Sequence, residues 1–351
     1  MCAKKSRKKL KNIFYLLILC VLLFAGYSTY VAFLKPNIYL DGKKYKFIYV
    51  PTKFTYDELI NMLEEENILQ DKKTFEWLAK AYDLKNTFKP GRYRIIAGMT
   101  NRQLINSFKN GKQEKVKITF NSADHTNDDI IKKISDKFEI TEEELETFFA
   151  TETSLRQKYN FTNENLRCFF IPETYELNWN TSLPEFMKMI EDNYIDFWTT
   201  ARKQKAKRAN LSETDVIILA SIVQSESAID DEQQQIAGVY INRINKNMPL
   251  QADPTLIYAV GDFSIQRVRR RDKDIDSPYN TYRNKGLPPG PICLPYLQAI
   301  DAVLNYNKHN FLYFCAKPNL SGYSDYSETY EEHQKYAAAY QKEMDKRGIN
   351  R

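Results

Sequence analysis

The sequence predicts an α+β fold preceded by one membrane-spanning helix. Three observations predict it: an uncharged apolar stretch near the amino terminus, short strand patterns that alternate with helix patterns, and a long apolar helix pattern over residues 212–228. A chain of 351 residues is long enough for two domains with their own cores. We therefore expect a basic tail at residues 1–12, an anchor at 13–34, a small α/β module at 40–112 and a larger mixed domain at 115–345.

The apolar stretch at residues 13–34 contains no charged side chain, and a helix of this length spans a hydrocarbon core of roughly 30 Å. The charged residues that precede it are all basic, so the positive-inside rule leaves the tail in the cytoplasm and everything after Lys35 outside. A cleaved signal peptide is the alternative, but the stretch is longer than such a peptide needs and no clear small-x-small cleavage site follows it. We expect a single-pass protein of the plasma (inner) membrane, with its large domain periplasmic or extracellular.

The charge distribution indicates which class of partner the protein binds. All of the net charge of +6 lies in the tail, and the rest of the chain has as many acidic as basic residues. Nucleic-acid binders need a net basic face, so we interpret the basic runs Arg267–Arg271 and Lys203–Arg208 as solvated and expect no nucleic-acid partner. A neutral exported domain suits a polymer that is mostly sugar.

Cysteine and histidine usage argues against several kinds of chemistry. Cys168, Cys293 and Cys315 follow the anchor, and an odd number allows at most one disulfide, so buried structural thiols are expected. The three histidines form no His-x-x-x-His pair, and Cys-x-x-Cys, Gly-x-Ser-x-Gly and glycine-rich nucleotide loops are missing from the sequence. We expect neither a metal nor a cofactor.

The small module is predicted as strand, helix, helix, strand and helix. Bulky β-forming residues mark the strands, and apolar residues three or four apart mark the helices. The last helix has a capping Thr100 and a stop at Gly111. The five elements are expected at residues 43–51, 55–64, 73–80, 89–98 and 100–110.

The larger domain is predicted to begin with a strand at Val116–Phe120, followed by helices at 126–134 and 141–149. Its central element is the helix over residues 212–228. Ser212 followed by Asp215 is the pattern of a capping box, and the residues behind it are apolar on nearly every side.

Glu226 is the candidate catalytic residue because it lies on the apolar stripe of this helix. The residues three, four, seven and eight positions before it are Val223, Ile222, Leu219 and Ile218. Apolar neighbours disfavour an ionised carboxyl and raise its pKa, which lets it carry a proton near neutral pH as a general acid. The alternative is a helix whose end emerges into water and leaves Glu226 solvated.

Several ordered motifs carry a family resemblance. The segments are Phe169–Tyr175, Ser225-Glu226-Ser227, Ala237–Arg243, Met248–Tyr258, Ser277–Tyr282 and Gly286–Ile292. In order and spacing they resemble the MltG (YceG-like) endolytic murein transglycosylases, and the Glu-Ser pair resembles the signature of lysozyme-like lytic transglycosylases. The small module is similar to the LysM-like module that this family has in the same position; a spacer without its own sugar site is the alternative.

The resemblance implies a lyase acting on peptidoglycan. Such an enzyme cuts the β-1,4 bond between MurNAc and GlcNAc of nascent glycan strands and leaves 1,6-anhydro-MurNAc ends, which would terminate glycan polymerisation. One carboxylate suffices, because the C6 hydroxyl of the sugar replaces water: Glu226 would act first as acid and then as base. Penicillin-binding proteins and other cell-wall synthases are the partners expected by family analogy.

The residues expected to hold the glycan offer amide and hydroxyl groups or flat aromatic faces. Asp253 has an alternative role in an Asp-Pro turn, and each tyrosine could instead belong to the core. The loop from Gly286 to Pro291 is expected to frame the cleft rigidly. The expected substrate-binding residues are Gln251, Asp253, Thr255, Tyr258, Tyr279, Asn280, Thr281 and Tyr282.

Two departures from the family pattern define an alternative function. Gln224 stands where the family usually has the first glutamate of Glu-x-Glu, and Ser324 stands where it usually has histidine. Gln224 faces about 160° away from Glu226 on a helical wheel, which favours Glu226 as the acid. The alternatives are a catalytically impaired protein that binds peptidoglycan or scaffolds cell-wall synthases, and a cell-surface protein with unrelated work.

Overall fold

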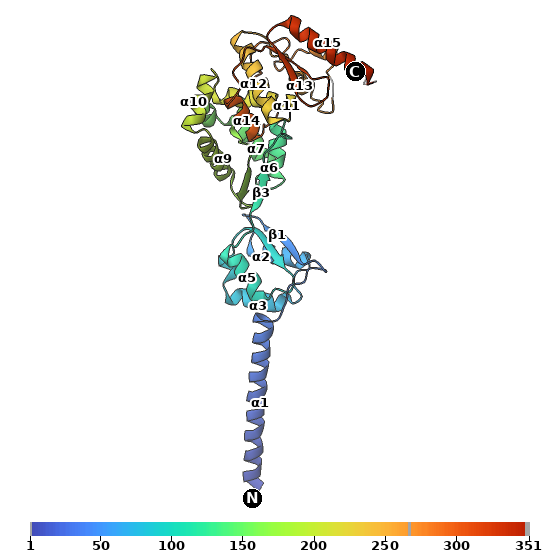
Figure 1. Ribbon diagram of the computed structural model, residues 1–351. Coiled ribbons are helices and arrows are strands. Elements are labelled where there is room, and N and C mark those ends of the chain that lie inside the picture. The colour runs from blue at the N-terminus through green and yellow to red at the C-terminus, as the bar shows by residue number, and fades with distance from the viewer. Residues whose placement is uncertain (1, 266–267, 348–351) are drawn as a thin grey trace. The chain divides into compact units, whose positions relative to one another are not determined.

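The computed structural model describes residues 2–265 and 268–347 and divides into two compact units (Figure 1). Unit 1 comprises residues up to Val116 together with Glu176–Thr181, and unit 2 comprises Lys117–Tyr175 and the chain from Ser182 onward. The larger domain was predicted as continuous over residues 115–345, whereas the segment Glu176–Thr181 groups with unit 1. Arg267, the first residue of one predicted basic run, lies outside the described residues.

The predicted apolar helix is confirmed as a helix, α1, which runs over Cys2–Phe33. Its stretch Lys11–Phe33 has a mean hydropathy of 2.2, and the side chains of this stretch are almost all exposed. By length and composition α1 is the one helix among the described residues that could cross a membrane, although a signal sequence would pass the same test.

The rest of unit 1 follows the predicted order of strand, helix, helix, strand and helix, with one additional short helix, α4. Capping boxes begin α2 at Thr55 and α5 at Thr100, and Gly111 ends α5 in the left-handed conformation, with φ 63°. The elements are β1 (Tyr45–Val50), α2 (Tyr56–Glu65), α3 (Lys72–Ala81), α4 (Leu84–Thr87), β2 (Gly91–Ile96) and α5 (Asn101–Asn110).

Strands β1 and β2 pair antiparallel, from Tyr45 opposite Ile96 to Val50 opposite Gly91. Because side chains alternate across a strand, one face of this sheet buries Ile48, Val50, Tyr93 and Ile95 against the helices. The module therefore has its own core. The core also includes Leu59, Leu63, Phe75, Leu78, Leu104 and Phe108.

Unit 2 is mainly helical and holds the sheet of β5 with β6 and most of the residues of the sheet of β3 with β4. The predicted strand at 116–120 and the helices at 126–134 and 141–149 are confirmed as β3, α6 and α7. The first half of the unit contains β3 (Val116–Thr119), α6 (Asn127–Ser135), α7 (Glu142–Thr151), α8 (Ser154–Tyr159), η1 (Leu166–Phe169), β4 (Thr174–Leu177), α9 (Leu183–Phe197) and α10 (Thr200–Arg208).

The second half is built around α11 (Glu213–Glu226), the predicted central helix, and its capping box between Ser212 and Asp215 is confirmed. Every residue from Val216 to Val223 is buried, because α10, α12, α13, α14 and η1 all contact this helix. The remaining elements are α12 (Asp230–Asn245), α13 (Asp253–Val260), η2 (Arg270–Asp274), α14 (Leu297–Leu304), β5 (Tyr313–Ala316), β6 (Ser324–Ser327) and α15 (Tyr330–Lys346).

The three cysteines that follow α1 in the sequence lie within unit 2. Cys168 and Cys293 are buried and Cys315 is half-buried, and none of the three forms a disulfide. Burial raises the pKa of the Cys293 thiol to about 11, which makes it unreactive near neutral pH.

Candidate active site

Glu226 is the last residue of α11, at the point where this buried helix reaches the surface of unit 2. Val223 and Ile222, one turn earlier on the same apolar stripe, are fully buried in the core. The Glu226 side chain itself is half-buried, and its Oε1 accepts a hydrogen bond of 2.8 Å from the Tyr240 hydroxyl. The carboxyl is thus enclosed on one side and open on the other.

Burial raises the pKa of Glu226 to about 7. Three charged or polar neighbours modify this effect: the hydrogen bond from Tyr240 lowers the pKa, the nearby Asp253 carboxylate raises it, and the Arg243 guanidinium lowers it. The net result is a carboxyl that can hold or release a proton near neutral pH. A general acid that later serves as a base needs this property.

Tyr240 and Arg243, which hold this site together, both come from α12, and no role for either was inferred from the sequence. Tyr240 is 1% exposed, and burial raises the pKa of its hydroxyl well above its usual value. The hydroxyl therefore stays protonated and donates a hydrogen bond to Glu226. The Arg243 guanidinium is buried and donates to three backbone oxygens, those of Leu312, Pro249 and Leu250, at 2.6, 3.3 and 2.7 Å. Arg243 therefore fixes the loop that follows α12.

Two of the predicted substrate-binding residues, Asp253 and Tyr282, lie close enough to Glu226 to interact with it electrostatically, and Gln251 accepts a hydrogen bond from Arg243 at 3.4 Å. Gln251 is exposed, adopts a positive φ of 53°, and donates its backbone N–H to the Thr281 carbonyl. Asp253 begins α13, is also exposed, and accepts a hydrogen bond from the Tyr282 hydroxyl. Gln251, Asp253 and Tyr282 are therefore linked to the site through hydrogen bonds or electrostatic contacts, and their contact with a glycan stays a prediction.

Three other predicted substrate-binding residues are buried and bond to the protein itself. The Thr281 hydroxyl accepts from the Ala252 N–H at 3.0 Å and lies 2.8 Å from the Thr255 hydroxyl. Asn280 donates to the carbonyls of Lys273 and Ile275, at 2.9 Å each. In this arrangement Thr255, Asn280 and Thr281 set the course of the loop, and their contact with a glycan stays a prediction.

Tyr258 lies beyond the first turn of α13, and the ring of Tyr279 lies beside the ring of Tyr258. Their ring centres are 4.5 Å apart, and together with Arg167 they line a cavity of about 290 Å³. The Tyr258 hydroxyl accepts from the Arg167 guanidinium at 3.0 Å. Tyr258 and Tyr279 therefore lie together at one cavity, and Glu226 is not among the residues that line it. No role for Arg167 was predicted from the sequence.

The loop from Gly286 to Pro291 is tied to α11 and η1. The Ile292 N–H donates to the Ser221 hydroxyl in the middle of α11, and Arg167 donates to the Pro291 carbonyl. Gly290 packs so tightly that a Cβ there would lie 2.0 Å from the Glu164 carbonyl oxygen, so a larger residue would displace the loop. These contacts give the loop a fixed course, as expected of a segment that frames a site.

Comparison with known proteins decides the family. The model of the YceG-like family matches residues 48–339, most of the chain. The chain belongs to the YceG-like family. It is 29% identical to an endolytic murein transglycosylase of Bacillus subtilis (strain 168), over 91% of both chains. It is 28% identical to a protein of the same name from Streptococcus pneumoniae serotype 2, over 95% of this chain and 65% of that protein.

The fold of this YceG-like protein has a counterpart among solved structures. The crystal structure of a yceG-like protein from Listeria monocytogenes aligns with 84% of this chain and 99% of its own, with a TM-score of 0.53 and 24% sequence identity. This likeness supports the fold.

The structure shows the contacts of Gln224 and Ser324, the two residues expected to depart from the family pattern. The Gln224 amide oxygen accepts the backbone N–H of Tyr296, so this side chain ties α11 to the start of α14 and does not join Glu226. Ser324 lies in β6, and its backbone N–H donates to Glu232 of α12 at 2.8 Å. Neither residue contacts the Glu226 carboxyl through any of its hydrogen bonds.

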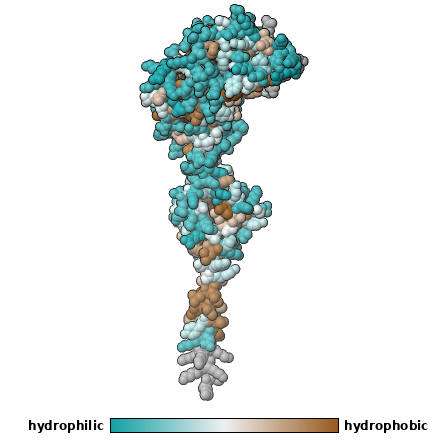
Figure 2. Space-filling model, in the orientation of Figure 1, coloured by the Kyte–Doolittle hydropathy of each residue, from teal (hydrophilic) through white to brown (hydrophobic). Residues whose placement is uncertain are grey.

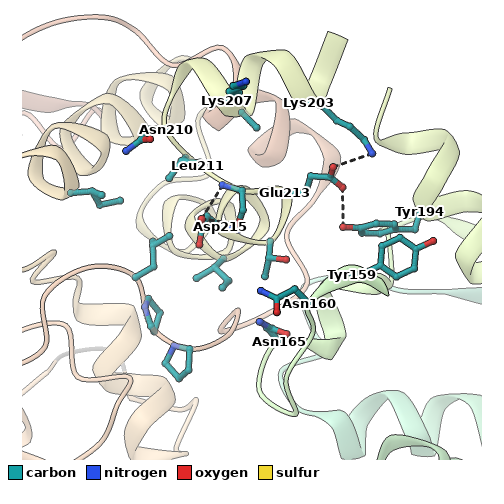
Figure 3. A pocket seen from close by; sticks show the side chains of 18 of the residues that line it. Tyr159, Asn160, Asn165, Tyr194, Lys203, Lys207, Asn210, Leu211, Glu213 and Asp215 are labelled. Atoms are coloured by element: carbon teal, nitrogen blue, oxygen red, sulfur yellow. Dashed lines mark hydrogen bonds and ion pairs between the residues drawn. The ribbon is translucent and has the colours of Figure 1, made fainter. Parts of the chain in front are cut away.

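A cavity of about 1240 Å³ lies at the opposite end of α11 (Figure 3). Polar side chains surround it, and Figure 3 shows Glu213 between Lys203 and the Tyr194 hydroxyl, both of which it bonds. Along a helix of 14 residues this end is about 20 Å from Glu226. The wide cavity and the candidate acid therefore lie at opposite ends of α11. We assign the chemistry to the end that carries the Glu226 carboxyl.

Metal ligation has no obvious place in the site. Among residues 2–265 and 268–347, the side chains of His, Cys, Asp and Glu do not gather in groups of three or more that could hold an ion.

Proposed function

We propose that this protein is an endolytic peptidoglycan transglycosylase, a lyase that uses Glu226 as its only catalytic carboxyl. The observation that carries the proposal is the carboxyl of Glu226, whose pKa burial raises to about 7 beside the Tyr240 hydroxyl. Membership of the YceG-like family and the names of the relatives, endolytic murein transglycosylase, support the choice of substrate.

The reaction begins with protonated Glu226, which donates its proton to the glycosidic oxygen between MurNAc and GlcNAc. Loss of that oxygen builds positive charge on the MurNAc ring, and the newly ionised Glu226 lies near enough to stabilise it. The same carboxylate then accepts the proton of the C6 hydroxyl as this oxygen bonds to C1. The product is 1,6-anhydro-MurNAc, and Glu226 recovers its proton for the next cycle.

The neighbours of Glu226 have roles in this scheme that follow from their contacts. Tyr240 donates to Oε1 and stabilises the ionised carboxylate in the second step. Gln251, Asp253 and Tyr282 hold sugar hydroxyl or N-acetyl groups on the exposed side. Tyr258 and Tyr279 offer aromatic faces to a pyranose farther along the strand.

The cell-level part of the proposal rests on α1. We propose that α1 is an uncleaved anchor in the plasma (inner) membrane, with the short tail in the cytoplasm and both units outside. The module of unit 1 is then LysM-like and held near the membrane, where glycan strands emerge from penicillin-binding proteins and other synthases. Cleavage there would terminate polymerisation of a strand.

Product analysis tests the proposal. The full-length protein, in detergent, is incubated with purified peptidoglycan, and the released fragments are identified by mass spectrometry. Anhydro-muramyl ends are expected from the natural chain, and Glu226→Gln should release at least about 10²-fold fewer. Reducing ends would make the protein a hydrolase, and binding to peptidoglycan without release of fragments would favour the impaired scaffold.

A further inference from the structure

An apolar cavity of about 430 Å³ lies within unit 1, between the outer half of α1 and α3. Phe24, Tyr27, Ser28 and Val31 line it from α1, and Lys73 and Trp77 line it from α3. Figure 2 shows a hydrophobic stretch of α1 directly beside the rest of unit 1.

The end of α1 is packed against α3. Ala32 is 2% exposed, and the Phe33 ring lies edge to face with the Trp77 ring, with centres 6.3 Å apart. Phe33 also contacts the Tyr82 ring at 6.3 Å. These contacts hold α3 beside the last turns of the apolar helix.

This arrangement fixes the depth of α3 if α1 spans a bilayer. From Ile13 to Phe33 the helix rises about 30 Å, the thickness of a hydrocarbon core. Phe24 and Val31 belong to this span, and Trp77 lines the same cavity. Trp77 therefore lies level with the outer boundary of the bilayer.

The chemistry of α3 suits that level. The Trp77 side chain is 57% exposed, and indole rings concentrate where acyl chains meet headgroups. Lys73 is exposed, so its ammonium can reach a lipid phosphate. An apolar cavity flanked by these two residues would be unfavourable in water and favourable at a membrane surface.

We propose that the cavity takes an acyl chain of an outer-leaflet phospholipid, with Trp77 at the headgroup boundary and Lys73 beside the phosphate. Unit 1 then rests on the membrane surface instead of hanging from a bare anchor. The proposal rests on the proposed membrane anchoring of α1 and needs no part of the proposed catalysis.

Tryptophan fluorescence of the full-length protein in liposomes tests the depth. Of the three tryptophans, Trp179 provides a matched control, because its ring contacts Tyr49 of β1, at the end of unit 1 away from α1 (Figure 1). One variant keeps only Trp77 and the other only Trp179, with phenylalanine at the remaining positions. Phospholipids brominated near the headgroup end of the acyl chains should quench Trp77 several-fold more than Trp179.

The outcomes separate this proposal from the anchoring on which it rests. Equal quenching in vesicles from which alkaline carbonate does not extract the protein would overturn the lipid contact and leave the anchor intact. Extraction by carbonate would overturn the anchor as well.

A phospholipid with a photoreactive acyl tail tests the cavity itself. It should crosslink to the peptide containing Lys72–Ala81, and Ser28→Phe, which fills the cavity from α1, should reduce that crosslink several-fold. Crosslinks to α1 alone, or an unchanged crosslink in the Ser28→Phe variant with an unchanged circular dichroism spectrum, would contradict a lipid in this cavity.

Discussion

The two ends of helix α11 each present acidic residues, yet their surroundings differ. At the first end Asp215 accepts from the Ser212 N–H and hydroxyl, and Glu213 pairs with Lys203 beside a wide polar cavity. At the last end Glu226 has one hydrogen-bond donor, Tyr240, and burial raises its pKa to about 7. The first end surrounds its carboxylates with hydrogen-bond donors and a lysine, whereas the second end makes the protonated form of Glu226 accessible near neutral pH.

This difference shows that the surroundings of a carboxyl, and not the size of the nearest cavity, assign the chemistry. Acids at a helix start interact favourably with the helix dipole and with cap N–H groups, which stabilises the fold. An acid that leaves the core at a helix end has lost much of its hydration without gaining a paired cation. Substitutions at the end that carries Glu226 can therefore be compared with matched substitutions at the other end of α11.

The largest expected effect is on catalysis. Glu226→Gln keeps the size of the side chain and removes its proton transfer, so release of anhydro-muramyl fragments should fall by about 10² to 10⁴. Asp215→Asn at the first end retains an oxygen that can cap the helix, and its rate should stay at the natural level. Equal losses in the two variants would contradict the contrast between the ends.

The second effect is on stability and depends on pH. The pKa of Glu226 is raised in the folded protein, from 4.5 to about 7, so the unfolded chain releases this proton at lower pH. As pH rises from 4.5 to 7 the group therefore destabilises the fold, by up to about 3 kcal/mol above pH 7.

Glu226→Gln removes this titration, so its free energy of unfolding relative to the natural chain should rise across that window. Denaturant unfolding at a pH below 4.5 and at one above 7 measures the change. The Asp215→Asn variant provides the control, and a difference between Glu226→Gln and the natural chain that does not vary with pH would refute the raised pKa.

A smaller effect concerns the hydroxyl that bonds Glu226. Activity should fall as pH rises through the pKa of Glu226, because the first step needs the protonated acid. Tyr240→Phe removes a hydrogen bond that lowers this pKa, so the alkaline limb of the pH–rate profile should move upward by about one pH unit. A limb that stays in place or moves downward would show that Tyr240 does not tune the acid.

The smallest effect belongs to the first end alone. Ser212→Ala removes the capping hydroxyl that accepts from the Asp215 N–H, and should reduce the free energy of unfolding by about 1 kcal/mol. Its pH–rate profile should match that of the natural chain. A shifted profile would mean that the two ends of α11 are coupled.

Local patterns were the part of the fold that the sequence predicted well. The capping boxes at Ser212 and Thr100 and the stop at Gly111 depend on residues within one turn of each other, and the structure has all three. Glu226 was singled out because its apolar stripe is a property of one helix. The strand and helix order of unit 1 followed from the same kind of short-range signal.

Contacts between elements could not be predicted in this way. Tyr240 is 14 residues from Glu226 on another helix, and the bond between them depends on how α11 and α12 pack. Nothing in the sequence distinguishes the buried Thr255 and Thr281 from exposed Gln251, because all three are polar residues within the matched motifs. Arg167 was missed since a lone arginine has no periodic signal; its role follows only from its contact with Tyr258 and Pro291.

The most direct test of the contrast is a titration of the Glu226 carboxyl itself. Infrared difference spectra of the full-length protein in detergent, natural chain minus Glu226→Gln, isolate the band of this protonated carboxyl as pH is varied. We expect the band to disappear with a midpoint near the pKa of about 7. A midpoint near the ordinary 4.5 would mean that burial does not raise the pKa of Glu226, and would contradict its role as the acid.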